Sequence, residues 1–276
     1  MTVIPAVLTL GLTGAVFGIV LAAAAKKFHV EQDPRQDKIC LCLPGANCGA
    51  CGFPGCAGLA QAIAAGDAAC NACPACGGEM VSKIASIMGI ELPIQTEKKV
   101  ARVLCQGSDD KSGLRYIYDG IHRCKAMNEI AGGAKSCVYG CLGLGSCVDA
   151  CAFDAIHMGP LGLPVVDDLN CTSCGLCVEA CPRDIIQLMP ISQQVVVACN
   201  SKEKGAKVRR VCKIGCIGCG ICVKVCPNGA ITLRDNLAII DPEKCDACGI
   251  CVEKCPTKCI VMTKEPNAIN GVANAG

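Results

Sequence analysis

The chain has 276 residues, room for about two domains, and 29 of them are cysteines. No convincing secretory signal accompanies the cysteines and their number is odd, so their dense CxxC spacing favours metal binding over a disulfide framework. Aromatic residues make up only 3% of the chain, which argues against a large conventional core and for metal clusters as organising centres. The formal net charge of +2 counts cysteines as neutral; thiolate-bound clusters would make the loaded protein acidic, which argues against nucleic-acid binding.

Residues 2–25 contain no charged side chain and are followed directly by Lys26 and Lys27. As a helix this stretch is long enough to cross the roughly 30 Å hydrocarbon core of a bilayer. A cleaved signal peptide fits less well, because no basic residue precedes the apolar run and the run is too long. The two lysines place the following domains in the cytoplasm. The sequence therefore predicts a single-pass anchor over 2–25 in the inner (cytoplasmic) membrane, then a linker over 26–38.

Residues 39–91 form the first predicted cluster domain. A loop rich in Gly and Pro leads into a predicted helix over 57–65 that ends at Gly66. Cys48, Cys51 and Cys56 lie on this loop, and Cys73 can return after the helix as fourth ligand. A small helical domain with one [4Fe–4S] cluster is expected, because the neighbouring modules use such clusters. Cys70 or Cys76 remains an alternative fourth ligand, and zinc, which also accepts four cysteines, is the rival metal.

Residues 92–136 lack a cluster motif and are interpreted as a linker or a small α/β insert. Residues 114–118 have the composition of a strand, and residues 121–131 are expected to form a short helix.

The second half of the chain contains four cysteine runs. Three of them follow the strict pattern C-x2-C-x2-C-x3-C-P: Cys171/Cys174/Cys177/Cys181, Cys216/Cys219/Cys222/Cys226 and Cys245/Cys248/Cys251/Cys255. The remaining run, Cys137-x3-Cys141-x5-Cys147-x3-Cys151, is wider, and Ala152 replaces the proline. The strict pattern is that of bacterial two-cluster ferredoxins, in which the fourth cysteine of a run binds the other cluster.

Two tandem two-cluster ferredoxin modules follow from these runs, over 137–192 and 212–263. An inter-module segment covers 193–211, and residues 264–276 form a tail. Each module should contain a β-hairpin between its halves, with an Asp235-Asn236 turn in the second and a looser connection over 156–167 in the first. Together with the anchor and the first cluster domain, this predicts an α+β protein.

Crossed ligation assigns four clusters to the modules. The four sets are Cys137, Cys141 and Cys147 with Cys181; Cys171, Cys174 and Cys177 with Cys151; Cys216, Cys219 and Cys222 with Cys255; and Cys245, Cys248 and Cys251 with Cys226. With the first domain, five [4Fe–4S] clusters use 20 cysteines, so 29 − 20 leaves nine: Cys40, Cys42, Cys70, Cys76, Cys105, Cys124, Cys199, Cys212 and Cys259. Cys212 is an alternative first ligand that the Cys-Pro register disfavours. Cys105, Cys124, Cys199 and Cys259 are expected to be small buried apolar groups.

The chain resembles the RnfB family, the B subunits of Rnf complexes, over nearly its whole length. The most specific part of the resemblance is NCGACGFPGC over 47–56 with NACPACGG over 71–78. The resemblance implies an electron-transfer subunit of a membrane-bound ferredoxin:NAD+ oxidoreductase that translocates Na+ or H+. Reduced soluble ferredoxin would be the donor, other Rnf subunits the acceptors, and a flavin/NAD subunit the end of the route. The wide first run departs from the usual spacing, and some family members carry more ferredoxin modules.

The sequence contains no G-x-G-x-x-G motif between a strand and a helix and no flavin motif, so direct binding of NAD or flavin is not expected. No catalytic residue is expected either. His29, His122 and His157 share no spacing and are not expected to bind metal. The main alternative function is a membrane-tethered polyferredoxin of a hydrogenase or another reductase; a structural zinc protein is a further one.

The segment 202–213 carries six basic residues and one acidic residue. A basic patch on an acidic protein is expected to steer acidic ferredoxins toward the second module. The alternative interpretation is an ordinary solvated linker.

Overall fold

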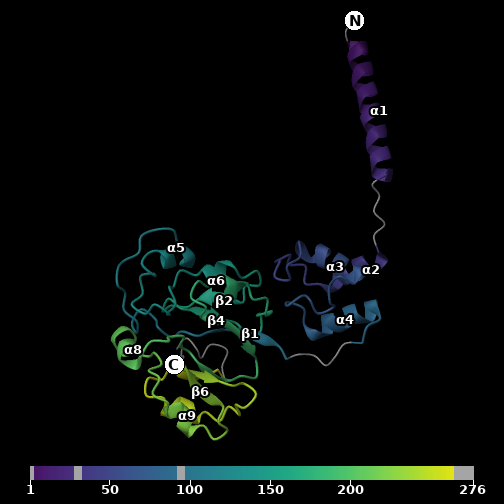
Figure 1. The fold of residues 1–276 in the computed structure, drawn as a ribbon. Coiled ribbons are helices and arrows are strands. Elements are labelled where there is room, and N and C mark those ends of the chain that lie inside the picture. The colour runs from purple at the N-terminus through teal and green to yellow at the C-terminus, as the bar shows by residue number, and fades with distance from the viewer. Residues whose placement is uncertain (1–2, 28–32, 92–96, 264–276) are drawn as a thin grey trace, which may run out of the picture.

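A computed structural model describes residues 3–27, 33–91 and 97–263 (Figure 1). Helix α1 (Val3–Lys27) coincides with the predicted anchor, and its large apolar side chains from Val7 to Leu21 that are described are exposed. Within the described part of the chain, none of the helices meets the combined length and hydropathy needed to cross a membrane. The span over 2–25 therefore stays a prediction. The predicted tail lies outside the described residues, as does the middle of the linker.

Three helices build the first cluster domain: α2 (Pro34–Cys42), α3 (Gly55–Ala65) and α4 (Gly78–Met88). Helix α2 begins inside the range predicted as linker, because Asp33 caps it and Pro34 suits its first turn. Helix α3 ends at Gly66 in the left-handed conformation, as the sequence predicts. Helix α2 packs on α3 and α4 around buried Ile39, Ile63 and Ile84.

The first ferredoxin module contains two antiparallel strand pairs and two one-turn helices. Strand β2 (Ile156–Met158) pairs with β3 (Pro164–Val166), which confirms the predicted first hairpin. Strand β1 (Lys99–Val103) pairs with β4 (Ile186–Pro190), so part of the predicted insert belongs to this module. The helices are α6 (Ser146–Asp149) and α7 (Leu176–Glu179).

The second module repeats this arrangement. Strand β6 (Ile231–Arg234) pairs with β7 (Leu237–Ile240) around Asp235 and Asn236, which both have positive φ, as a tight hairpin turn requires. Strand β5 (Val195–Val197) pairs with β8 (Ile260–Met262) in the same way that β1 pairs with β4. The helices are α8 (Gly205–Val211), α9 (Ile221–Val225) and α10 (Ile250–Lys254).

Residues 114–118 do not form the predicted strand. Leu114 makes an isolated bridge to Lys135, and the Ile117 side chain is 91% exposed, so no neighbouring strand covers it. The hydroxyl of Tyr116 instead donates a hydrogen bond to the carbonyl of Ile130, and that of Tyr118 donates one to the carbonyl of Ile121. The expected helix nearby is present but shorter, as α5 (Cys124–Glu129).

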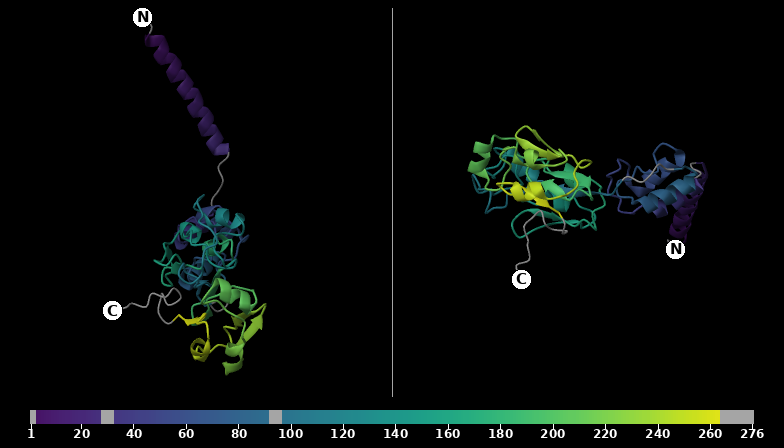
Figure 2. Two further views of the ribbon diagram at one scale, coloured as in Figure 1. Left: turned by 90° about the vertical axis from the view of Figure 1, so that its left-hand side faces the viewer. Right: turned by 90° about the horizontal axis from the view of Figure 1, so that it is seen from below.

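The modules and the first domain are separate packing units that touch. Each module has its own core, in which apolar strand residues surround cysteines. Figure 2 shows the helical domain beside the two modules rather than between them. Phe153 of the first module packs against the core of the helical domain. A buried ion pair between Arg102 and Asp168 ties β1 to the loop that leads to Cys171.

The loop of the second module that carries Cys216 and Cys219 runs close to the hairpin turn. Gly218, between them, has φ +64°, and a Cβ there would lie 2.8 Å from the backbone oxygen of Asn236. Gly229 has nearly the same φ, +59°, but a Cβ there would meet nothing within 4 Å.

We expect Gly229→Ala to lower the free energy of unfolding by about 1 kcal/mol through backbone strain alone. Gly218→Ala should lower it by about 1–3 kcal/mol more, because its methyl group would also overpack against the turn. Denaturant midpoints of the cluster-loaded protein measure both. Equal losses of stability in the two variants would show that the loop is not tightly packed against the turn.

Candidate iron–sulfur sites

The first domain brings its predicted ligands together around one cavity of about 320 Å³. Cys48, Cys51, Cys56 and Cys73 all line it, and Phe153 of the first module closes one part. Asn47 fixes the loop, because its side-chain oxygen accepts a hydrogen bond of 2.8 Å from the backbone N–H of Cys56. Cys70 and Cys76, the alternative fourth ligands, do not line this cavity. A hydrogen bond from Cys76 is the main cause that lowers the pKa of Cys73 to about 6.

The second module brings together one predicted crossed set in the same way. A cavity of about 320 Å³ is lined by Cys216, Cys219, Cys222 and Cys255. Cys259, 2% exposed, also lines it, and its sulfur lies 3.6 Å from that of Cys255. A hydrogen bond from Cys259 is the main cause that lowers the pKa of Cys255 to about 4.

Electrostatic effects group the other crossed set of the second module. Burial, and after it the charges of Cys245, Cys248, Cys222 and Cys226, raises the pKa of Cys251 to about 11. Cys226 comes from the other half of the module, as crossed ligation requires. Its sulfur accepts a 3.3 Å hydrogen bond from the backbone N–H of Ala230.

The corresponding set of the first module follows the same pattern. Burial and then the charges of Cys171, Cys174 and Cys151 raise the pKa of Cys177 to about 11. The backbone N–H of Ala101 in β1 donates a 3.5 Å hydrogen bond to the sulfur of Cys171.

The remaining set of the first module differs from the sequence prediction. A cavity of about 370 Å³ is lined by Cys141, Cys147 and Cys181, three of the four predicted ligands. Its fourth cysteine is Cys124, which the spacing left unassigned, whereas Cys137 lines a different cavity. Cys124 is held beside α6, because its backbone N–H donates a 2.8 Å hydrogen bond to the Ser146 hydroxyl.

A sequence signal for this difference exists in the spacing. Cys141, Leu144, Cys147 and Cys151 have the strict C-x2-C-x2-C-x3-C spacing, with leucine in place of the second cysteine. In the other three runs a left-handed glycine follows the second cysteine and begins a helix: Gly175, Gly220 and Gly249. Gly145 follows Leu144 in the same conformation before α6. In this register the first run therefore lacks a cysteine at its second position.

The donor sets fit iron–sulfur clusters in their chemistry, since each consists only of sulfur. Among the described residues, no group of three or more His, Cys, Asp or Glu side chains is arranged to hold a single metal ion. In a cubane, each thiolate binds its own iron atom. Burial raises the pKa of Cys147 to about 12 and that of Cys222 to about 11, so cluster binding must displace the thiol protons.

Comparisons with known families place iron–sulfur segments on these sites. Residues 43–75 match a family described as "Putative Fe-S cluster". Families described as "4Fe-4S dicluster domain" match residues 136–186, 170–231 and 215–259. The dicluster matches support [4Fe–4S] clusters in both ferredoxin modules, and the first match supports an iron–sulfur cluster in the helical domain.

The chain is also similar to curated proteins over most of its length. It is 48% identical over 236 residues to the B subunit of the Na(+)-translocating ferredoxin:NAD(+) oxidoreductase complex of Acetobacterium woodii, covering 86% of this chain and 71% of that protein. It is 44% identical over 232 residues to the B subunit of the ion-translocating oxidoreductase complex of Methanosarcina acetivorans, covering 84% and 88%. The B subunit of the proton-translocating ferredoxin:NAD(+) oxidoreductase complex of Clostridium ljungdahlii is 43% identical over 245 residues, covering 88% and 86%.

The cysteine-lined cavities, the matched iron–sulfur segments and these relatives lead to one family. The chain belongs to the RnfB family, the B subunits of Rnf ion-translocating oxidoreductase complexes.

Proposed function

We propose that this chain is the iron–sulfur electron-transfer subunit of an ion-translocating ferredoxin:NAD+ oxidoreductase. The observation that carries the proposal is the gathering of cysteines around shared cavities, all but Cys124 inside segments that match iron–sulfur families. The relatives, named as B subunits of such complexes, supply the reaction and the other complex subunits as partners. The chain acts by relaying electrons, and the site that transfers hydride to NAD+ lies on another subunit. Relatives named for Na+ and for protons are similarly close, so we propose ion translocation without choosing the ion.

At least five [4Fe–4S] clusters are proposed, one for each predicted cysteine set. Cavities support the set of the first domain, the set of Cys216 with Cys255, and the three cysteines Cys141, Cys147 and Cys181. Mutual electrostatic effects support the other two sets, which contain Cys177 and Cys251. These five sites account for about 20 iron atoms, since each cubane holds four.

Removing two ligands of one set should remove one whole cluster. We expect Cys48→Ala with Cys51→Ala, and separately Cys219→Ala with Cys222→Ala, to lose about four iron atoms and four sulfides per chain. The measurement is iron and sulfide analysis of anaerobically purified full-length protein. Cys40→Ala with Cys42→Ala, which changes two cysteines outside the sets, is the matched control. Full iron content in either test variant would refute the assigned set.

We further propose that residues 2–25 anchor the chain in the inner membrane, with the cluster domains on the cytoplasmic side. The absence of charge over this stretch, the helical conformation of Val3–Lys27 and the exposure of its described apolar side chains support the anchor. Lys26 and Lys27 at its end support the orientation.

The orientation predicts how protease reaches the protein. In sealed, right-side-out cells, added protease should leave the cluster domains intact, and it should digest them once the cells are opened. A chain without residues 1–28 should leave the membrane fraction and keep its brown colour. Digestion in intact cells would contradict the orientation, and membrane retention of the shortened chain would contradict the anchor as the only attachment.

Soluble ferredoxin is the proposed electron donor, and the basic segment 202–213 is its proposed docking surface. Its six basic side chains, Lys202, Lys204, Lys207, Arg209, Arg210 and Lys213, are all exposed. Of the six, only Lys207 forms an ion pair within the described structure, with Glu203 at 2.7 Å. Buried Val208 packs α8 against the rest of the protein, and the three basic residues of that helix, Lys207, Arg209 and Arg210, are exposed. A fixed positive surface attracts an acidic partner over a distance that salt shortens.

Charge reversal tests this surface. The triple variant Lys207→Glu, Arg209→Glu, Arg210→Glu should accept electrons from reduced ferredoxin at least about tenfold more slowly at low salt, and the difference should shrink as salt rises. Cluster content should not change. The control reverses three exposed lysines elsewhere, Lys38, Lys83 and Lys244, with the same change in net charge. A test variant as fast as the control would exclude the segment as the docking surface.

A further inference from the structure

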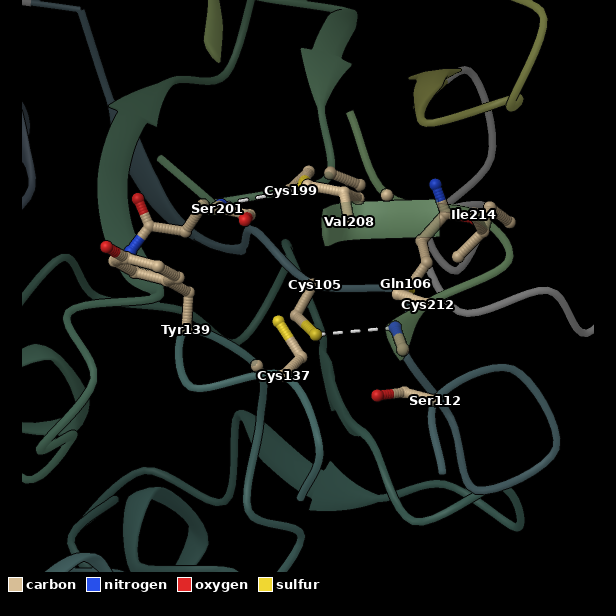
Figure 3. Close-up of a pocket in the computed structure, with 15 residues that line it drawn as sticks. Cys105, Gln106, Ser112, Cys137, Tyr139, Cys199, Ser201, Val208, Cys212 and Ile214 are labelled. Carbon is tan, nitrogen blue, oxygen red and sulfur yellow. Dashed lines mark hydrogen bonds between the residues drawn. The ribbon is translucent and has the colours of Figure 1, made fainter. Parts of the chain in front are cut away.

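Four cysteines that the module cavities do not use line a cavity of their own. Cys105, Cys137, Cys199 and Cys212 surround a space of about 370 Å³ (Figure 3). The space is similar in size to the other three cysteine-lined cavities. Each of the four cavities is lined by at least four cysteines.

The four cysteines form two equivalent pairs, one from each module. Cys105 follows β1 by two residues and Cys199 follows β5 by two residues, and these two strands occupy equivalent positions in the modules. Cys137 and Cys212 each begin a C-x2-G-C sequence that ends at Cys141 and Cys216. The cavity therefore lies where the internal repeat brings the same two positions of both modules together.

Hydrogen bonds to sulfur repeat the same symmetry. The sulfur of Cys105 accepts backbone N–H bonds of 3.3 Å from both Gly107 and Cys141. The sulfur of Cys199 accepts equivalent bonds from Ser201 at 3.5 Å and Cys216 at 3.3 Å. Backbone donors of this kind also reach Cys171 and Cys226, which are proposed cluster ligands. Such bonds stabilise thiolates and tune iron–sulfur clusters.

Gly107 shows how close sulfurs of different modules come. A Cβ at Gly107 would lie 3.5 Å from the sulfur of Cys105 and 3.8 Å from that of Cys212. The contact between the modules is held nearby, because the Ser112 hydroxyl donates a hydrogen bond to the Val211 carbonyl, and the Lys213 N–H donates one to the Lys111 carbonyl.

A polar group in this cavity lacks a partner. Gln106, 8% exposed, lines the cavity, and its buried side-chain N–H2 group has no hydrogen-bond acceptor in the described structure. A buried donor without an acceptor costs about 1–3 kcal/mol. Sulfide or thiolate of a bound cluster would accept this hydrogen bond.

We propose that Cys105, Cys137, Cys199 and Cys212 bind a sixth [4Fe–4S] cluster at the junction of the two modules. Cys124 then takes the place of Cys137 as fourth ligand beside Cys141, Cys147 and Cys181. It supplies the thiolate that is missing from the first run, where leucine stands at position 144. The identity of the cofactor rests on the proposed function, whereas the ligand set rests on the geometry of the junction. A cluster held by both modules would let electrons pass from one module to the other, and Cys212 directly follows α8, the proposed docking helix.

Cluster counting by native mass spectrometry under anaerobic conditions tests this proposal on the full-length chain. The wild-type protein should carry six Fe4S4 units, about 24 iron atoms. The double variant Cys199→Ala/Cys212→Ala should carry five, and Cys40→Ala/Cys42→Ala should carry six. A wild-type maximum of five clusters, or six clusters in folded Cys199→Ala/Cys212→Ala protein, would overturn the proposal. One zinc ion in place of the sixth cluster would overturn it as well.

Two further double variants test which cluster Cys137 serves. If Cys137 and Cys199 share one cluster, Cys137→Ala/Cys199→Ala removes one whole unit and leaves the others intact. If Cys124 and Cys181 share one cluster, Cys124→Ala/Cys181→Ala likewise removes one. If the first variant instead loses iron from two different clusters, Cys137 binds the same cluster as Cys141, as the sequence predicts. Loss of the clusters at Cys48/Cys51 and Cys219/Cys222 is measured separately, so failure of the sixth site does not imply failure of the proposed function.

Discussion

Ligation of buried cysteine sulfur is the interaction on which the rest of this structure depends. The strands have three to five residues and most helices of the modules about one turn, too little regular structure to supply a large apolar core. The module cores are instead built of short apolar strands around cysteines, many of which are buried. Burial holds the pKa of several of these thiols well above the usual range, so the metal-free state keeps them protonated. Cluster binding exchanges those protons for iron, and it thereby couples folding to cofactor loading.

Repetition of one ferredoxin half explains most of the architecture, and its exceptions show where function has been added. Three runs keep the Cys-Gly step before a short helix, and the first run keeps the glycine but has Leu144. The replacement removes a ligand locally, and α5 brings a cysteine from outside the run. The strand pairs β1–β4 and β5–β8 extend both modules in the same way and end beside the junction cavity. A duplicated module thus creates a cysteine-lined cavity that neither copy has alone.

The arrangement suggests an order of contacts for electron flow. Phe153 packs between the first domain and the first module, and it lines the cavity of the first cysteine set. The charge of Cys48 contributes to the raised pKa of Cys174, after burial as the main cause, so these two sites are close. The junction cavity joins the first module to the second, and the basic helix α8 lies at its edge. The proposed ferredoxin surface and the proposed membrane anchor thus belong to opposite parts of the chain, with cysteine sites between them.

Features that depend on local spacing could be predicted from the amino-acid sequence. The strict runs identify the ligands of a compact loop, the Asp235-Asn236 turn identifies a hairpin, and Gly66 identifies a helix end, because each signal lies within a few residues. The set Cys48, Cys51, Cys56 and Cys73 also followed from spacing, since one helix returns the chain to its own loop.

The positions of cysteines without a strict run depend instead on tertiary contacts. Nothing near Cys105 or Cys199 in the sequence indicates that they meet, because strand pairing and the contact between two modules bring them together. The wide spacing from Cys137 to Cys141 indicates an irregular ligand pair, whereas the fold places these two sulfurs in different cavities. A cluster requires four sulfurs close in space, and spacing along the chain predicts that closeness only when a single loop supplies them.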